Sequence, residues 1–439
     1  MTVSFRLACI CAALAASSCT IVNDVDPCGA KTTEARVSEP SPELELISHP
    51  QAVAQIVDGR MLAAYLTHDQ TNPTGLHLIA FNATSGVRVD ACSEPDYLLS
   101  SDSPTNPTLV AADFMFGAQH IVAAVAWTSG SAGFFSRKVR YQLLDDRLCV
   151  VGPEGGVEMA PSLDTLTEDA ALAWSPTESA VWATFHDTRT IYRTRIVNGL
   201  PTGSTPIVQG QLLIDNYRMT LAEDGRGLAT WYASNDPSEL LADRRHLRAV
   251  LLGPGLEPRK NALTGTAGVF EPSSPTPYRA PDLNNTLALA VRTDRYALAF
   301  DGIVAPNTRP IAHVLELDAT DGRPRGKPWR VDPDSSEAHG KPAATYLPGD
   351  NLFVAWASPS GQGTVARLFQ SGGRPRFTGV ACGEARFAIG TRAPANDRGL
   401  LSMARTGNGV WVLHPAELGA DHAVMAWRVE SAELWPASN

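Results

Sequence analysis

The sequence predicts an all-β fold, a seven-bladed β-propeller built from four-stranded blades. Three observations support this prediction: an apolar run ending in a bulky residue recurs along the chain, a proline precedes most copies, and a further apolar run follows each copy. The recurring positions lie 46 to 69 residues apart, with a mean spacing of 58. Repeats of this length with several strands each are typical of propellers, whose blades bury their faces only by packing around a ring.

The first strand of each repeat is marked by its start and its end. Proline suits the start of a strand, where its missing N–H removes no ladder hydrogen bond. The end of the strand is a turn rich in Asp, Asn and Gly, such as Asp58-Gly59 and Asp224-Gly225, which tolerate the positive φ of tight hairpins. The prolines are Pro50, Pro107, Pro161, Pro281, Pro342 and Pro394, and Asn216-Tyr217 replaces proline in the fourth copy.

The second strand of each repeat ends in the recurring bulky residue, which we interpret as a wedge in the packing between neighbouring blades. Recurrence at a fixed place in a strand favours a core role. The alternative for Trp127 or Trp356 is a stacking site for a sugar. The seven positions are Tyr65, Trp127, Phe185, Trp231, Phe300, Trp356 and Leu413.

The third strand follows a loop of variable length, as in "LHLIAF", "IYRTRIV" and "TVARLF", and "KPWRV" at 327–331 is the expected fourth strand of the fifth blade. Only ten residues follow the third strand of the last copy, at 423–429. We therefore expect an N-terminal strand, Glu43 to Ile47, to pair with the last blade and close the ring. The alternative is that "AELWPA" near the C-terminus supplies this strand.

The proline starts, hairpin turns and "VAW…TVARLF" pattern resemble the divergent seven-bladed propellers of secreted and envelope bacterial proteins, over residues 42–439. This resemblance implies the architecture and no specific activity. The pairing of Gly-His with Trp-Asp found in WD repeats is missing, and so is the Asp box of sialidases.

The first eighteen residues predict export. One cation, Arg6, precedes an apolar stretch that is too short to span a bilayer, which is the pattern of a secretory signal peptide. The sequence "AASSC" resembles a bacterial lipobox, which implies that Cys19 is lipidated; ordinary cleavage near Ser18 is the alternative. We expect residues 1–18 to be the signal peptide, 19–41 a flexible tether, and 42–439 the propeller. Thr20 after the Cys implies an outer-membrane lipoprotein of a Gram-negative bacterium.

The remaining cysteines and the charge narrow the class of protein further. Cys28, Cys92, Cys149 and Cys382 form an even set in an oxidising compartment, so two disulfides are expected in one of three pairings. The formal net charge of −10 argues against nucleic acid as a partner. Contact with the membrane is expected only through the lipid.

No motif in the sequence identifies a reaction, a metal or a cofactor. The HExxH, GxSxG, Walker A and dinucleotide-binding patterns are missing. The remaining argument is positional: loops after the second strands should emerge on one face, where His and carboxylate groups can bind a metal or act as a general base. Solvated loop residues are the alternative. The candidates are His68, Asp69, His186, Asp187, Asp301 and His414.

Two functions follow from these observations. The preferred hypothesis is a non-enzymatic, lipid-anchored propeller that presents a rigid face to a protein or glycan partner in the envelope. The second is an envelope hydrolase or lyase at the mouth of the propeller channel, using His186, Asp187 and His414. An enzyme requires two titratable groups within hydrogen-bond reach of each other in a concave site, whereas a binding module requires only an exposed patch.

Overall fold

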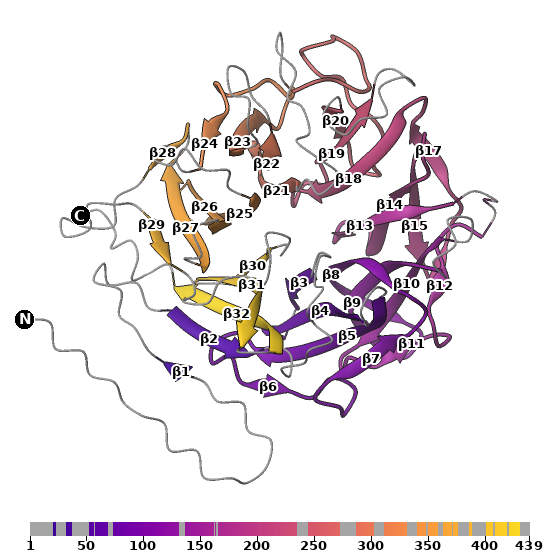
Figure 1. The fold of residues 1–439 in the computed structure, drawn as a ribbon. Coiled ribbons are helices and arrows are strands. Elements are labelled where there is room, and N and C mark those ends of the chain that lie inside the picture. The colour runs from indigo at the N-terminus through magenta and orange to yellow at the C-terminus, as the bar shows by residue number, and fades with distance from the viewer. Residues whose placement is uncertain are drawn as a thin grey trace, which may run out of the picture.

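The computed structural model shows seven antiparallel sheets arranged around a ring, and this confirms the predicted seven-bladed propeller (Figure 1). Each innermost strand contacts the innermost strands of its two neighbours, and the last contacts the first. The described residues contain no helix, hence no helix able to cross a membrane. The structure describes residues 21–22, 32–36, 52–56, 58–68, 73–130, 137–161, 163, 166–234, 245–272, 287–302, 311–331, 340–347, 350–358, 363–370, 372–375, 386–388, 401–406, 409–418 and 421–430.

Each blade runs outward from the centre of the ring in chain order. The innermost strands are β3 (Ala52–Gln55), β8 (Thr105–Phe116), β13 (Glu168–Ser175), β18 (Leu212–Leu221), β21 (Leu287–Arg292), β25 (Gly340–Leu347) and β30 (Ser402–Thr406). The second strands are β4 (Arg60–His68), β9 (Gln119–Ser129), β14 (Ala180–His186), β19 (Gly227–Ser234), β22 (Arg295–Gly302), β26 (Asn351–Ser358) and β31 (Gly409–Leu418).

The outer half of each blade is less regular than the inner half. The third strands are β5 (Pro73–Asn82), β10 (Lys138–Asp145), β15 (Ile191–Val197), β20 (His246–Leu252), β23 (Ile311–Asp318), β27 (Gly363–Gln370) and β32 (Asp421–Glu430). The short outer strands are β6 (Arg88–Val89), β7 (Tyr97–Ser100), β11 (Val150–Val151), β12 (Val157–Glu158), β16 (Leu200–Pro201), β17 (Thr205–Val208), β24 (Trp329–Arg330), β28 (Arg374–Pro375) and β29 (Arg386–Ala388). In blade 4 an isolated bridge between Ala249 and Phe270 takes this place.

An N-terminal strand closes the ring, as predicted, but the segment differs from the expected one. Strand β2 (Thr32–Arg36) pairs antiparallel with β32 of the last blade, and β1 (Ile21–Val22) pairs with β2 (Figure 1). The expectation that 19–41 is a tether therefore does not hold for residues 32–36. The predicted strand Glu43–Ile47 and the alternative "AELWPA" lie outside the described residues.

The recurring bulky residues form the core between blades, as predicted. Trp127 packs in the apolar cluster that joins blades 1 and 2, and Trp356 packs in the cluster between blades 5 and 6. Both indoles have no exposed surface, so neither is a sugar-stacking site. The buried positions are Tyr65, Trp127, Phe185, Trp231, Phe300, Trp356 and Leu413.

A β-bulge at the start of the innermost strand recurs directly opposite this aromatic residue. Two residues of β8, Asn106 and Pro107, lie across from Trp127 alone, because the pairing jumps from Thr105 to Thr108. The same two-against-one pairing sets 169–170 opposite Phe185, 216–217 opposite Trp231, and 341–342 opposite Trp356. Two of the predicted strand-start prolines, Pro107 and Pro342, thus lie in a bulge. Pro50, Pro281 and Pro394 lie outside the described residues. In blade 3 the bulge is Asp169-Ala170, and the assignment of Pro161 to this position was wrong.

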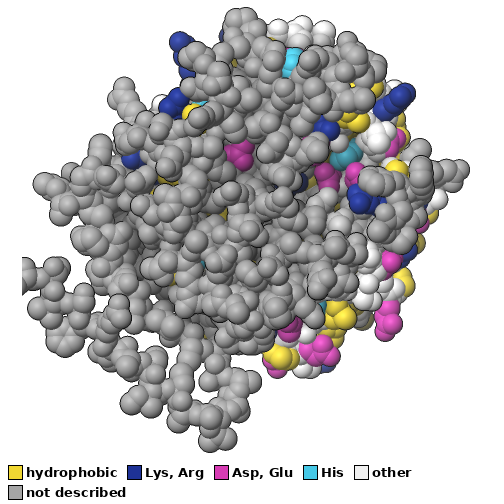
Figure 2. All heavy atoms as spheres, viewed as in Figure 1, with side chains coloured by type: hydrophobic (Ala, Val, Ile, Leu, Met, Phe, Trp, Pro, Cys, Tyr) yellow, Lys and Arg dark blue, Asp and Glu magenta, His cyan; other side chains and the backbone are white. Residues whose placement is uncertain are grey.

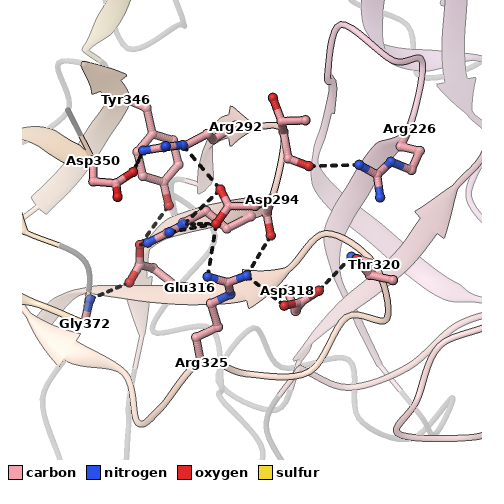
Figure 3. Close-up of polar contacts among 12 residues, drawn as sticks. Arg226, Arg292, Asp294, Glu316, Asp318, Thr320, Arg325, Tyr346, Asp350 and Gly372 are labelled. Carbon is pink, nitrogen blue, oxygen red and sulfur yellow. Dashed lines mark hydrogen bonds and ion pairs between the residues drawn. The ribbon is translucent and has the colours of Figure 1, made fainter. Parts of the chain in front are cut away.

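Polar clasps join the blades at the opposite end, where the innermost and second strands form hairpin turns. Arg226 donates to the carbonyl oxygen of Thr293 in the next blade, at 2.9 Å. Glu316 accepts hydrogen bonds from the hydroxyl of Tyr346, at 2.9 Å, and the backbone N–H of Gly372, at 2.7 Å, both in blade 6 (Figure 3). Asp294 binds Arg295 and Arg325 within blade 5. These contacts hold blades 4, 5 and 6 in register.

A disulfide between Cys92 and Cys149 adds a covalent link between blades 1 and 2. Cys92 follows β6, and Cys149 lies in the turn between β10 and β11. One disulfide expected from the sequence is thus present. Cys28 and Cys382 lie outside the described residues.

Candidate functional site

The bulges place polar side chains at the starts of three adjacent innermost strands. Asn106, Asp169 and Asn216 occupy the same bulge position of blades 2, 3 and 4, and their φ angles are 49°, 46° and 53°. This left-handed conformation is unusual for residues other than glycine, and Asn and Asp tolerate it best. A bulge redirects its side chain out of the regular alternation of the strand, which is why bulges often accompany functional sites.

Asp169 is the centre of a cluster of polar groups from these blades. The side-chain amide of Asn106 in blade 2 donates to its Oδ1. In its own blade, His186 Nε2 lies 3.5 Å from its Oδ2. The Asp169 side chain is 14% exposed and that of His186 only 3%. The carboxylate is therefore held by groups from two blades and keeps a small exposed surface.

The charges of this pair stabilise each other. Burial acts to raise the pKa of Asp169, but the nearby His186, Arg218 and Asn106 lower it below the usual value for aspartate. For His186, burial acts to lower the pKa, and the hydrogen bond and negative charge of Asp169 outweigh it, so the pKa is raised. The geometry thus favours an ionised Asp169 beside a protonated His186.

A second carboxylate, Asp215, begins the bulge of blade 4. Arg245, in the residues before β20, makes an ion pair with its Oδ2. Burial is the main cause of a raised pKa at Asp215, and the negative charge of Asp169 adds to it against the charge of Arg245. The Asp215 side chain is 26% exposed, more than that of Asp169. Two carboxylates in one cluster therefore have pKa values shifted in opposite directions.

Arg218 adds a cation close to both carboxylates. It follows the bulge in β18, and its Nη1 donates to the carbonyl oxygen of Tyr217 at 2.8 Å. Its charge interacts with Asp169 and Asp215. We call Asn106, Asp169, His186, Asp215, Arg218 and Arg245 the polar cluster. Figure 2 shows acidic, basic and histidine side chains close together on the face turned to the viewer, to the right of its centre.

The structure brings two of the sequence-predicted residues, His186 and Asp187, to this region. His186 belongs to the polar cluster through Asp169, and its Nδ1 lies 2.7 Å from the backbone oxygen of Asp187. The Asp187 side chain instead caps a turn: it accepts from the backbone N–H groups of Arg189 and Thr190 and from the hydroxyl of Tyr192. Asp187 therefore organises the β14–β15 turn.

The other predicted residues lie elsewhere in the ring. Asp301 and His414 follow the recurring bulky residue in blades 5 and 7, as His186 does in blade 3, and all three are buried. The expectation that these residues lie in loops was wrong, because each belongs to a second strand, β14, β22 or β31. His68 ends β4, and nothing is described of its side chain; Asp69 lies outside the described residues.

The described residues hold no group of three or more His, Cys, Asp or Glu side chains placed to bind a metal ion. The histidines singled out from the sequence are distributed over several blades, and within the described ranges the polar cluster combines carboxylates with arginines. Mixed charges of this kind suit hydrogen bonding to a polar ligand better than coordination of a cation.

Most of the polar cluster was missed from the sequence. Asn106 stands directly before the strand-start proline Pro107, and Asp169 stands directly before Ala170, which takes the corresponding place in blade 3. Asn216 was interpreted only as a substitute for proline. The residue before the blade 3 marker Pro161 is Ala160, so the markers taken from the sequence could not reveal Asp169. The contact of Asp215 with Arg245 joins residues 30 positions apart and leaves no local signal.

A separate polar chain crosses blade 1. Thr67 Oγ1 lies 3.3 Å from His77 Nε2, and His77 Nδ1 lies 2.9 Å from Asp96 Oδ1. The hydroxyl of Tyr65 donates to Asp96 Oδ2 at 2.6 Å. These residues lie on β4, β5 and the segment before β7, so the chain ties the outer strand to the blade.

Comparison with known proteins assigns no family to this chain. Neither a protein-family model nor a curated protein matches the chain. A solved prolyl endopeptidase is 12% identical to this chain, with a TM-score of 0.46. The match covers 89% of this chain and 48% of the endopeptidase, so this chain spans about half the length of that protein. The propeller domain of the Trilobed protease from Pyrococcus furiosus is 7% identical, with a TM-score of 0.44, over 92% and 98%. A GH93 α-L-arabinofuranosidase of Fusarium graminearum is 10% identical, with a TM-score of 0.42, over 90% and 99%.

Proposed function

We propose that this protein is a lipid-anchored propeller of the bacterial envelope that binds a glycan at the polar cluster. The observation that carries the proposal is that bulges in three adjacent blades direct Asn106, Asp169 and the Asp215 region to one place. The side chains of Asp169 and Asp215 stay 14% and 26% exposed, so part of each remains accessible to a ligand. A glycan offers hydroxyl groups that donate to such carboxylates.

The proposed location in the envelope rests on the sequence and is supported by one disulfide. The first eighteen residues have the pattern of a signal peptide, and Cys19 occupies the lipobox position. The Cys92–Cys149 disulfide suits an oxidising compartment outside the cytosol. A Cys19→Ser variant should move from the membrane fraction to the soluble fraction of the envelope. Retention of the variant in the membrane fraction would contradict lipid anchoring.

The second function, hydrolysis, is favoured by one observation. The pKa of Asp215 is raised and that of Asp169 is lowered, and of two neighbouring carboxyl groups the one with the raised pKa is the better proton donor. Such a pair can supply a general acid and a base or nucleophile to a glycosidic bond. In this reading Asp215 is the acid, Asp169 is the base, and His186 holds Asp169 ionised.

Both functions are tested with the full chain and Asp215→Asn, using Asp113→Asn as the matched control because the Asp113 side chain, in β8 of blade 2, is 54% exposed. Binding is measured on a glycan array, and cleavage of the retained glycans is followed by mass spectrometry. We expect Asp215→Asn to abolish retention and the control to bind like the wild type. Equal retention by all three proteins would reject the polar cluster as the binding site. Glycans shortened by the wild type and by the control, but not by Asp215→Asn, would establish the hydrolase.

A further inference from the structure

The charges of the polar cluster do not balance. Its three cations, His186, Arg218 and Arg245, face two carboxylates. His186 is paired with Asp169, and Arg245 is paired with Asp215. Among the residues that the structure describes, Arg218 has no ion-pair partner, so this part of the chain places an excess positive charge in the cluster, in a protein whose formal net charge is −10.

The protonation of His186 follows from its hydrogen-bonding partners. Nδ1 lies 2.7 Å from the carbonyl oxygen of Asp187, and Nε2 faces the Asp169 carboxylate at 3.5 Å. A carbonyl and a carboxylate are both acceptors, so both ring nitrogens have to carry a proton to interact favourably. The imidazolium offsets the charge of Asp169, and Asp169 therefore cannot neutralise Arg218 as well.

Arg218 is half-buried, and its guanidinium has more N–H donors than it uses among the described residues. A guanidinium has five N–H donors, and among the described residues its hydrogen bond goes to one acceptor, the carbonyl oxygen of Tyr217. Its charge interacts with Asp169 and Asp215, yet within that part of the chain it forms no ion pair with either. Burial lowers the pKa of Arg218 and so opposes its charge. A bound anion would remove this cost.

We infer that the polar cluster recognises an acidic sugar, with the ligand carboxylate on Arg218 and its hydroxyl groups on Asp215 and Asn106. A uronic acid residue carries a single charge, which matches the one cation of the cluster that forms no ion pair among the described residues, and it also carries several hydroxyl donors. Carboxylates on arginine form short, charge-assisted and often bidentate hydrogen bonds. A doubly charged phosphate would meet repulsion from Asp169 and Asp215, and a peptide carboxylate would bring no hydroxyl groups for them. This inference rests on the proposed glycan binding and specifies its substrate class.

The experiment compares oligogalacturonates with neutral galacto-oligosaccharides of the same length by isothermal titration calorimetry on the full chain. We expect the acidic series to bind more tightly by at least tenfold, and Arg218→Gln to weaken it by about 10- to 100-fold while changing the neutral series little. Arg323→Gln removes the same charge from a side chain that is 69% exposed and should leave both series unchanged. Arg218→Lys keeps the charge and should lose less affinity than Arg218→Gln.

The outcomes separate this inference from the proposed function. Equal binding of acidic and neutral sugars, unaffected by Arg218→Gln, would overturn the inference and leave glycan binding in place. Tighter binding of sugar phosphates or of peptide carboxylates would also overturn it. Failure of every glycan to bind would reject both the inference and the proposed function. Should Arg218→Gln fail to fold, the acidic-to-neutral preference of the wild type and the affinity of Arg218→Lys still decide the matter.

Discussion

His186 and Asp169 form a buried ion pair, with Nε2 of the imidazole 3.5 Å from Oδ2 of the carboxylate. The two residues reach each other because Asp169 lies in the β-bulge of β13, which begins just after Glu168, the partner of His186 across the ladder. In a regular strand Asp169 would not face His186, because the ladder pairs His186 with Glu168. The bulge turns Asp169 toward this histidine. The ion pair is thus a product of the backbone irregularity.

Replacing Asp169 should change the charge of His186. With Asp169 in place, the pKa of His186 is raised, so the ring should be doubly protonated at neutral pH. In Asp169→Asn the negative charge is lost, and burial should then lower the pKa below its ordinary value near 6.5. The ring-nitrogen chemical shifts of His186 in an NMR pH titration measure this directly. Asp113→Asn, beside the exposed His120, should leave His186 unchanged. A neutral His186 in the wild type at pH 7 would contradict the assignment.

The clasp around Glu316 should be a large local contribution to stability. Its side chain is 2% exposed, and its carboxylate accepts from Tyr346 and Gly372. Glu316→Ala leaves both donors in blade 6 without their acceptor, while Arg295 keeps its ion pair with Asp294. Two buried donors without a partner should cost about 2–5 kcal/mol. Chemical denaturation of the variant measures the change. Glu223→Ala, at an exposed turn residue, should change the free energy of unfolding by less than about 0.5 kcal/mol. A similar small effect for Glu316→Ala would show that the clasp contributes little.

The blades could be predicted from the sequence because each buries one bulky residue, such as Trp231, at the same place in an apolar strand. The closing strand could not be located, because the segment "TTEAR" has no alternation of apolar residues, whereas "ELELIS" has it. A strand at the outer edge of a blade is specified largely by main-chain pairing. The polar cluster was missed for a different reason. Strands are predicted from the alternation of apolar and polar residues, and a bulge interrupts this alternation.

The Cys92–Cys149 disulfide should stabilise the junction of blades 1 and 2. It closes a loop with a sequence separation of 57 residues, and the chain-entropy relation gives about 4 kcal/mol for a loop of that length. The double variant Cys92→Ser with Cys149→Ser should therefore lose roughly 2–4 kcal/mol of unfolding free energy. Denaturation under reducing and non-reducing conditions measures it. The reducing agent should destabilise the wild type more than it destabilises the double variant. Equal sensitivity of the two proteins would show that the bond does not stabilise the fold.

His313 should make the protein less stable in mildly acidic solution. It lies in β23 between blades, donates from Nδ1 to the Ile311 carbonyl oxygen at 2.6 Å, and stacks on Phe300. Burial lowers its pKa to about 4 from the usual histidine value of about 6.5. Between these two values the unfolded chain binds a proton that the folded chain does not, so the free energy of unfolding falls as the pH is lowered from 6.5 to 4.

The size of this loss is about 3 kcal/mol, from the difference between the two pKa values. His313→Gln removes the titrating group, so the dependence of unfolding free energy on pH between 6.5 and 4 should become flatter, even if the variant is less stable at every pH. His120→Gln removes a histidine whose side chain is 40% exposed and should retain the slope of the wild type. Urea denaturation at a series of pH values compares the three proteins. Parallel curves for the wild type and His313→Gln would show that another group causes the acid sensitivity, because only the titration of His313 distinguishes these two chains in that window.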